Sequence, residues 1–433
     1  MQPRIFIPVI AAVLMSVLQS FAADWPQWRG PNRDGVWPED GIIQKFGSEQ
    51  LPIRWRAKIS NGYSGPSVAK GRVYVTDKVS RPNVKERVHC FDAMNGRKIW
   101  SYEYECNYDR IGHGDGPRAS VSLNNNRAYS LGAAGHLFCF DASSGKVIWS
   151  KDLDTEYDIQ KLHWGIAPSP LVEKDLVIVL IGGRDNACVV AFDKETGRER
   201  WRALGDQASY SAPIIIEQAG KQVLVCLTGK RVVGLDPLTG KLYWEYPFPP
   251  ARMIHNIATP VFHNNYMFFS GFFDGSLLLK LCPEMLVVEK VWQRRGPSEK
   301  KTESLHCNIS TPILQGDYIY GVDSYGELRC LDLYTGDRIW ESLDAVPQGR
   351  WSNIHLIRNQ DRVWMFNERG ELIISKLSPK GFHEISRAKL IKPTEGQLDQ
   401  RGGVCWTHPA FADKHVYVRN DEELVCADLS ARD

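Results

Sequence analysis

Short runs of apolar and β-branched residues alternate with turn sequences along most of the chain. Between residues 310 and 340, four such runs are separated by turns at 316–317, 324–326 and 335–336. Runs of this kind, rich in Ile, Tyr and Leu and bounded by Gly, Asp and Ser, are typical of β-strands. No long apolar pattern with the 3.6-residue period of a helix interrupts them. The stretch therefore predicts a unit of four short strands.

A ten-residue cassette shows that this unit is repeated. Five copies follow the pattern Phe-Asp-x-x-Ser/Thr-Gly-Lys/Arg-x-x-Trp, with some substitutions, at 91–100, 140–149, 192–201, 235–244 and 331–340. The Asp side chain can accept hydrogen bonds from the turn that follows it, and the Gly allows the positive φ that closes a hairpin. We expect the tryptophans of the series to be structural, since a large ring is readily buried where blades meet. They are Trp55, Trp100, Trp149, Trp201, Trp244, Trp292 and Trp340.

The spacing of the repeats predicts a closed ring. Successive tryptophans of the series lie 43 to 52 residues apart, a period typical of propellers and solenoids. Innermost strands are expected to start near Pro66, Pro117, Pro170, Pro213, Pro260, Pro312, His355 and Pro409. The eighth copy ends at 424–428 without an outer strand, whereas 51–56 resembles an outer strand with no cassette before it. We therefore predict an all-β, eight-bladed β-propeller of four-stranded antiparallel blades, closed by an N-terminal strand that removes the open edge.

Two of the eight copies depart from the cassette. The fifth has Leu281-Cys282-Pro283-Glu284 at the position of the turn, although Trp292 is kept, and the seventh has Ile385 near the tryptophan position. Degenerate units are common in repeat arrays. We interpret both as decayed copies rather than as sites with a special role.

The N-terminus resembles an export signal. Arg4 precedes an apolar stretch at 5–18, and Ser20-Phe21-Ala22 forms a small-x-small site with cleavage after Ala22 or Ala23. The apolar stretch is too short for a transmembrane span, and no cysteine near the cleavage site offers a lipid anchor. The chain is therefore divided into a signal peptide at 1–23, an N-terminal arm at 24–50 and a propeller at 51–433. We expect the mature protein in the periplasm or outside the cell.

Charge and cysteine content narrow the function classes further. A formal net charge of +2 offers no basic stripe for nucleic acid. Four of the ten cysteines occupy equivalent positions in different blades, which the rotation of the ring keeps apart, and we interpret them as small core residues rather than disulfides. They are Cys90, Cys139, Cys330 and Cys426. No Cys-x-x-Cys pair suggests a zinc or redox site, and the pairing of the other cysteines stays open.

Segments that link the outer strand of one blade to the inner strand of the next are expected to converge at one mouth of the central channel. Six of the 11 histidines lie in or beside these segments. The aromatic rings of these segments can stack on a planar quinone or on the apolar face of a sugar, and the arginines of these segments can pair with carboxylates. The ligand-binding candidates are His113, Arg118, His163, Trp164, Tyr210, His255, Asn256, His306, Asn308, Arg350, Trp351 and Trp406.

Other interpretations of these residues are purely structural. Tyr, Trp, His and Asn at blade starts also pack and hydrogen-bond the seams between blades. His408, directly before Pro409, is interpreted as a core histidine. His255 and His306 can face one another across neighbouring blades, but a metal would need a third ligand that the sequence does not identify.

Two segments carry a resemblance to a known family. The cassette resembles the repeat of pyrroloquinoline quinone (PQQ) enzymes and their relatives, and residues 24–35, starting Asp-Trp-Pro-Gln-Trp-Arg-Gly-Pro, resemble the start of exported PQQ-like propeller proteins. The similarity covers nearly all of the mature chain. The family includes quinoprotein dehydrogenases, the BamB lipoprotein and exported propellers without an assigned reaction.

The resemblance implies two functions. One is a PQQ-dependent oxidoreductase acting on an alcohol or sugar, with calcium polarising the quinone and Asp115 as a weak candidate for the base. However, the chain has no adjacent cysteine pair of the kind that quinoprotein alcohol dehydrogenases hold against the quinone, and it lacks the lipid-anchor cysteine of BamB. Motifs of hydrolases and nucleotide-binding proteins are also missing from the sequence. We therefore favour a non-catalytic binding or interaction scaffold with a protein or glycan partner.

Overall fold

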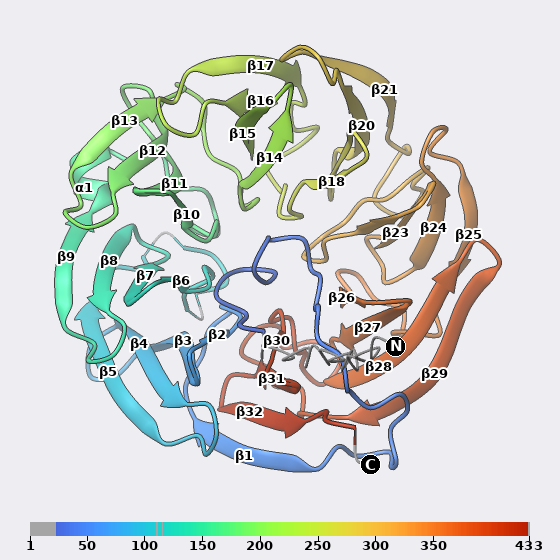
Figure 1. Ribbon diagram of the computed structural model, residues 1–433, viewed down its shortest axis with the longest axis horizontal. Coiled ribbons are helices and arrows are strands. Elements are labelled where there is room, and N and C mark those ends of the chain that lie inside the picture. Colours follow the sequence, from blue (N-terminus) through green and yellow to red (C-terminus); the bar gives the residue numbers. More distant parts are fainter. Residues whose placement is uncertain (1–22, 110, 115, 432–433) are drawn as a thin grey trace, which may run out of the picture.

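The computed structural model describes residues 23–109, 111–114 and 116–431. In this part of the chain the strands form eight sheets of four strands each, arranged in a ring (Figure 1). The prediction of an all-β, eight-bladed β-propeller is confirmed. The only helix of the described residues, α1 (Leu153–Tyr157), follows the second blade.

Blades one to seven each contain four consecutive strands, from the axis outwards. The first four blades are β2 (Ser67–Ala69), β3 (Arg72–Val79), β4 (Lys85–Asp92) and β5 (Lys98–Glu105); β6 (Ser122–Asn124), β7 (Arg127–Leu131), β8 (His136–Asp141) and β9 (Val147–Asp152); β10 (Leu171–Glu173), β11 (Leu176–Gly183), β12 (Ala187–Asp193) and β13 (Glu199–Ala203); and β14 (Ile214–Gln218), β15 (Lys221–Leu227), β16 (Arg231–Leu235) and β17 (Leu242–Pro247). The next three are β18 (Val261–His263), β19 (Tyr266–Gly271), β20 (Gly275–Leu281) and β21 (Val288–Arg294); β22 (Ile313–Gln315), β23 (Tyr318–Val322), β24 (Leu328–Asp332) and β25 (Arg338–Ser342); and β26 (Ile354–Asn359), β27 (Arg362–Asn367), β28 (Glu371–Ser378) and β29 (Gly381–Lys389).

Blade eight is built from both ends of the chain. It combines β30 (Ala410–Ala412), β31 (His415–Arg419) and β32 (Glu423–Asp428) with the N-terminal strand β1 (Ile53–Lys58) as its outermost strand. β1 runs antiparallel to β32, and Trp55 lies opposite Cys426 (Figure 1). The predicted closure of the ring by an N-terminal strand is confirmed.

The cassette joins each blade to the one before it. In blade four, Asp236 Oδ1 accepts hydrogen bonds from the backbone N of Leu238 (2.8 Å) and Thr239 (3.2 Å), so the expected turn forms. Gly240 has φ +72°, and a Cβ added to it would lie 2.6 Å from the ring of Trp201 in blade three. Trp201 Nε1 in turn donates to Pro237 O of the blade-four turn at 3.2 Å. The tryptophan of one blade thus packs on the cassette glycine of the next.

The apolar core lies between neighbouring blades. Leu180 and Val189 of blade three pack in one cluster with Leu224 and Val233 of blade four. The four cysteines at equivalent cassette positions are fully buried and carry free thiols, as expected of small core residues. None of the described segments is a helix long and apolar enough to cross a membrane.

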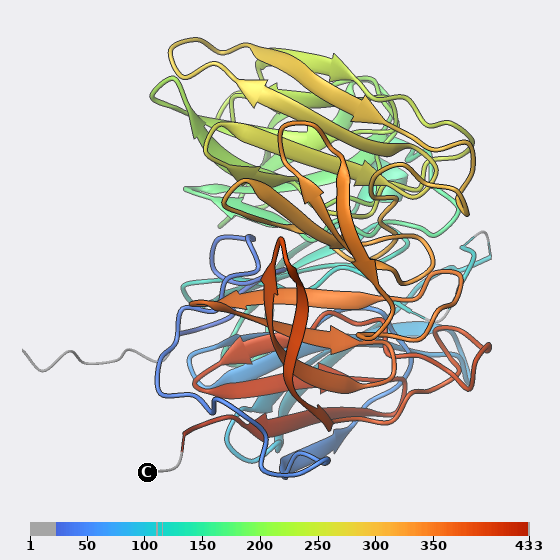
Figure 2. The same cartoon turned by 90° about the vertical axis from the view of Figure 1, so that its right-hand side faces the viewer.

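The N-terminal arm crosses the centre of the ring and contacts several of the inner strands. Trp25 pairs with Val68 of β2 through two backbone hydrogen bonds of 2.8 Å, and Trp37 N donates to Arg358 O of β26, also at 2.8 Å. Figure 1 shows the blue arm looping through the middle of the ring, and Figure 2 shows that it enters from the side opposite the cyan linker between β5 and β6. The sequence predicted an arm at 24–50 but gave it no role in the ring. The predicted signal peptide, residues 1–23, lies outside the described part of the chain except for Ala23.

A buried arginine fixes the arm on the axis. The Arg33 side chain donates from Nη1 to Ser169 O (3.2 Å) and Pro213 O (3.1 Å), at the starts of blades three and four, and Nη2 contacts Pro170 O. Burial lowers the pKa of Arg33 to about 9. The arm therefore supplies, through Arg33, a hydrogen-bond donor to the carbonyls at the starts of these blades.

Candidate functional site

A cavity of about 150 Å³ lies where the blade-linking segments converge. Each of the eight linkers contributes at least one side chain to its wall, and Trp28 of the arm reaches it as well. Trp28 Nε1 donates to Thr259 Oγ1 at 2.8 Å, and this bond anchors the Trp28 indole to the linker before blade five. The arm therefore supplies part of the cavity.

The structure brings many of the predicted site residues together. Lining the cavity are His113, Arg118, Trp164, Tyr210, His255, Asn308, Trp351 and Trp406. His163, Asn256, His306 and Arg350 lie in the same linkers but do not line it. Asp115, the weak candidate for a base, lies outside the described residues. Which of these residues bind a ligand stays a prediction.

Aromatic rings form one wall. The centroid of the Trp164 ring lies 5.2 Å from that of Tyr210 and 4.5 Å from that of His255. The Tyr210 hydroxyl accepts a hydrogen bond from Trp164 N at 3.1 Å, and burial raises the pKa of Tyr210 to about 12. This wall is therefore neutral at physiological pH and presents ring faces and edges, which suit a flat or apolar ligand surface.

His255 is held as a neutral ring. It is 5% exposed, and burial lowers its pKa to about 4. Its Nε2 lies 2.8 Å from Asn308 Oδ1, and because the amide oxygen only accepts, Nε2 carries the proton. Nδ1 is then an acceptor, and it has no hydrogen-bond partner among the described residues. Such an arrangement positions the imidazole but provides no adjacent nucleophile for it to activate.

Arg118 brings a positive charge to the cavity. Its guanidinium lies 4.9 Å from the ring centre of Tyr63. Nη2 donates to Gly112 O at 3.0 Å, and further bonds reach the carbonyls of His113 and Gly116. No carboxylate of the described residues forms an ion pair with Arg118. The bonds to these carbonyls fix the orientation of the Arg118 guanidinium within the linker.

Arg350 was predicted as a ligand-binding residue, but it is engaged in the linker itself. Its Nε and Nη2 donate to the two carboxylate oxygens of Glu299 at 2.7 and 2.9 Å. The guanidinium lies 4.4 Å from the ring centre of Trp351 and so supports that side chain. Sequence reasoning did not pair Arg350 with Glu299, because the two lie 51 residues apart.

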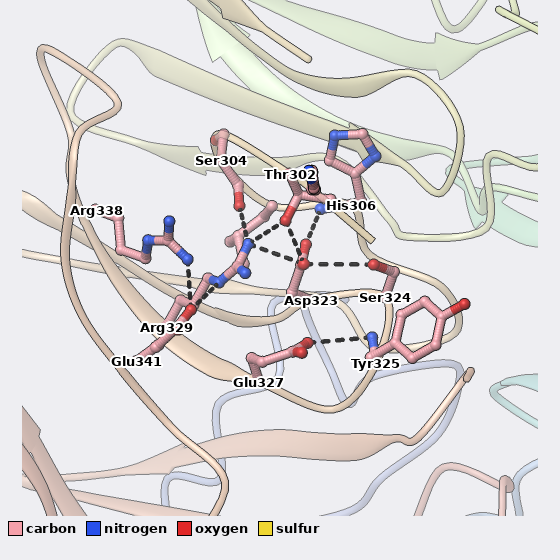
Figure 3. A network of polar contacts seen from close by, with 12 residues as sticks. Thr302, Ser304, His306, Asp323, Ser324, Tyr325, Glu327, Arg329, Arg338 and Glu341 are labelled. Carbon is pink, nitrogen blue, oxygen red and sulfur yellow. Dashed lines mark hydrogen bonds and ion pairs between the residues drawn. The ribbon is translucent and has the colours of Figure 1, made fainter. Parts of the chain in front are cut away.

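His306 belongs to a buried polar network beneath the linker (Figure 3). Its backbone N donates to Asp323 Oδ1 at 2.6 Å, and Asp323 forms an ion pair of 2.8 Å with Arg329. Its Nδ1 donates to Phe272 O at 2.9 Å, and burial lowers its pKa. The ring of Phe272 also contacts His255, at 4.8 Å between centroids. The two histidines thus share a phenylalanine neighbour and have separate hydrogen-bond partners.

The described residues do not fit a calcium-bound quinone. Calcium requires six to eight oxygen ligands, with carboxylates prominent among them. No Asp or Glu is among the described residues that line the cavity, and no group of three or more His, Cys, Asp or Glu side chains in the described residues is placed to hold a metal ion. We therefore derive no reaction through a quinone.

Several lining residues were not among the ligand-binding candidates of the sequence. They are Trp28, Tyr63, Ala167, Ser169, Ala212, Ile257, Ile309 and His408. Most follow the predicted candidates by a few residues, so wider linker segments would have included them. His408 is 4% exposed, as a core histidine would be, but it also lines the cavity, and its ring lies 5.0 Å from that of Trp28. Trp28 lies in the N-terminal motif, whose place on the axis no local pattern indicates.

Comparison with known proteins shows a sequence family and a shared fold. The family model described as outer membrane protein assembly factor BamB matches residues 84–342. BamB from Moraxella catarrhalis is 16% identical, over 87% of this chain and 99% of that one, with a TM-score of 0.56. Quinohemoprotein alcohol dehydrogenase from Comamonas testosteroni is 14% identical, over 95% and 81%, with a TM-score of 0.65. At these identities the two solved structures show a common fold only. No curated protein has significant sequence similarity to the chain.

Proposed function

The chain belongs to the family of the outer membrane protein assembly factor BamB, among the PQQ-like propellers, and from this premise we propose that it is an exported, non-catalytic binding protein. Its ligand is a glycan or similar ring compound that carries a carboxylate. The observation that carries the proposal is the central cavity, which combines an aromatic wall with the charge of Arg118, and no described carboxylate forms an ion pair with that side chain. Such a cavity is the usual place for a ligand in a propeller.

The aromatic side chains suit the apolar face of a sugar. Trp164, Trp351 and Trp406 come from three different linkers, so a ring that enters the cavity meets indoles from several directions. Each indole offers a large apolar face on which the C–H face of a sugar ring can be buried. The guanidinium of Arg118 favours a carboxylate through its charge.

The proposed function needs no catalytic step from the residues that line the cavity. His255 is bound to Asn308, an amide that cannot act as a nucleophile, and the described lining contains no acidic side chain. A general base must lie within hydrogen-bond reach of the proton that it takes. The alternative, a PQQ-dependent oxidoreductase, would need ligands for calcium that the described lining does not supply.

Export is supported by the N-terminal sequence, with its apolar stretch at 5–18 and small residues at 20 and 22. A periplasmic or secreted protein meets cell-envelope glycans, which agrees with the proposed ligand class. A protein partner remains the other predicted partner and is an outcome of the test below.

Titration of the mature protein with neutral and acidic oligosaccharides tests the proposal, with PQQ plus calcium as a separate arm. We expect saturable quenching of tryptophan fluorescence and a raised melting temperature with the acidic glycans alone. In Arg118→Met, affinity for them should fall by about tenfold or more, because a charge-assisted contact contributes about 1.5–3 kcal/mol. Arg184→Met, at an exposed arginine away from the cavity, is the matched control.

Each other result points elsewhere. Binding of PQQ with calcium, followed by oxidation of an alcohol or sugar, would replace the proposal by a dehydrogenase. No response to any small ligand would reject the cavity as a glycan site and leave a protein partner. Equal loss of affinity in both arginine variants would show that the charge of Arg118 is not recognised.

A further inference from the structure

Glu39 of the arm has a buried carboxylate that lies beside Ala23, the first described residue of the chain. Its side chain is 3% exposed. Oε2 accepts hydrogen bonds of 2.7 Å from Trp37 Nε1 and from Lys414 N of blade eight. Oε1 accepts a third bond of 2.7 Å, from the backbone N of Ala23. The carboxylate therefore links the start of the chain, the arm and the last blade.

Among the residues that the structure describes, no positive charge is paired with this carboxylate. Within the described residues, Glu39 forms no ion pair with a lysine, arginine or histidine side chain. Burial of a charge costs free energy unless the group is both hydrogen-bonded and paired. Three N–H donors satisfy the oxygens of Glu39 but do not neutralise it, and no described residue supplies a cation to the site.

The backbone nitrogen of Ala23, which donates to Glu39 Oε1, would become charged if a peptidase cleaved the bond before it. Small residues at 20, 22 and 23 leave two cleavage positions open, after Ala22 or after Ala23. Hydrolysis of the Ala22–Ala23 peptide bond consumes one water, leaves a carboxylate on Ala22 of the released leader and turns the Ala23 nitrogen into an α-ammonium. That nitrogen already lies 2.7 Å from Glu39 Oε1. Hydrolysis after Ala23 would instead remove the donor.

We propose that a leader peptidase cleaves between Ala22 and Ala23, and that the new α-ammonium of Ala23 forms an ion pair with Glu39. The pair anchors the arm only in the processed protein. Because Trp28 of the same arm lines the cavity and Arg33 fills the axis, correct processing also fixes those side chains. The inference rests on the proposed export of the chain and is independent of the ligand.

The N-terminus of the protein purified from the exporting host tests the cleavage position. Edman sequencing and intact mass should show a chain that begins Ala23-Asp24-Trp25. A chain that begins at Asp24 would overturn the inference while leaving export intact. A chain that keeps Met1 would overturn the export proposal, and the inference with it.

The pKa of the α-amine tests the ion pair. We would dimethylate the mature protein with ¹³C-formaldehyde under reducing conditions and follow the N-terminal signal by NMR between pH 6 and 11. An ordinary α-amine titrates at about 7.7–8.0, and the partner carboxylate should raise this pKa by about one unit or more. In Glu39→Gln the pKa should return to the ordinary range, whereas Glu49→Gln, an exposed position of the same arm, should leave it raised.

An ordinary pKa in the unaltered protein would overturn the ion pair whatever the variants do, so the test does not depend on the folding of Glu39→Gln. A raised pKa that persists in Glu39→Gln would assign the effect to another group and would equally overturn it. A structural role for Glu39 without the ion pair would destabilise the variant but would not move the α-amine.

Discussion

The indole Nε1 of Trp244 donates a hydrogen bond of 2.8 Å to Oε1 of Gln218. Both residues belong to blade four, whereas Trp201 and Trp292 bond to main-chain carbonyls in the turn of the following blade. The amide Nε2 of Gln218 faces three carbonyls of the blade-five turn, those of Cys282 (3.3 Å), Met285 (3.0 Å) and Val287 (2.8 Å). Gln218 thus connects Trp244 to the turn of blade five, which lacks the cassette sequence.

Replacement of Gln218 by leucine should destabilise the ring. The change leaves the buried Trp244 N–H and at least one turn carbonyl without partners, at about 1–3 kcal/mol each. We expect the free energy of unfolding, measured with urea, to fall by about 2–4 kcal/mol. Gln222→Leu, at an exposed position of the neighbouring strand, should change it by less than about 0.5 kcal/mol. Equal effects of the two changes would refute a bridging role for Gln218.

The sequence indicated the ring and its closure because both depend on a local signal that recurs. Each cassette carries its own turn, strand and tryptophan, so the period could be read without knowing which residues touch. The substitute in blade five left no such signal. Gln218 lies 64 to 69 residues before the carbonyls that it contacts, and only the packing of two blades brings them together.

Substitution of Gly240 should destabilise the protein more than substitution of another glycine with a similar φ. Gly240 and Gly220 have φ of +72° and +68°, so an alanine is strained by about 1–2 kcal/mol at either position. A Cβ at Gly240 would also lie 2.6 Å from Trp201, whereas nothing lies within 4 Å of one at Gly220. We expect Gly240→Ala to lower the free energy of unfolding by about 1–3 kcal/mol more than Gly220→Ala. Equal losses in urea unfolding would show that the seam accommodates a methyl group.

Arg33→Met should loosen the arm from the axis. The methionine fills part of the space but leaves the carbonyls of Ser169 and Pro213 without their donor. We expect a loss of about 2–5 kcal/mol in unfolding free energy. We also expect trypsin to cleave the arm faster, at Arg29, which the variant keeps. Arg184→Met, at an exposed arginine, should change neither quantity. Unchanged protease resistance in Arg33→Met would mean that the strand pairs of Trp25 and Trp37 hold the arm without Arg33.

The candidate site was predictable only as far as topology fixes it. The linkers converge in any propeller, so Trp164, Tyr210 and Trp406 could be placed at the cavity from their position in the repeat. Orientation is a different matter, because it depends on partners in other blades. Arg350 turns to Glu299 and leaves the cavity, while Trp28 comes to it from an arm with no repeat to locate it.

The burial of His255 should make the ring less stable in acid. Its pKa is lowered from the ordinary 6.5 to about 4 in the folded protein, because burial disfavours the imidazolium. The unfolded chain therefore binds a proton first as pH falls, and stability that is fully present above about pH 6.5 is lost as pH approaches 4. The loss is at most about 3 kcal/mol. Urea unfolding at intervals from pH 7.5 to 4 should show proton uptake on unfolding that decreases by about one in His255→Gln. His383→Gln, at an exposed histidine, should leave the pH dependence unchanged. An NMR titration in which His255 becomes charged near pH 6.5 would contradict its burial in this neutral state.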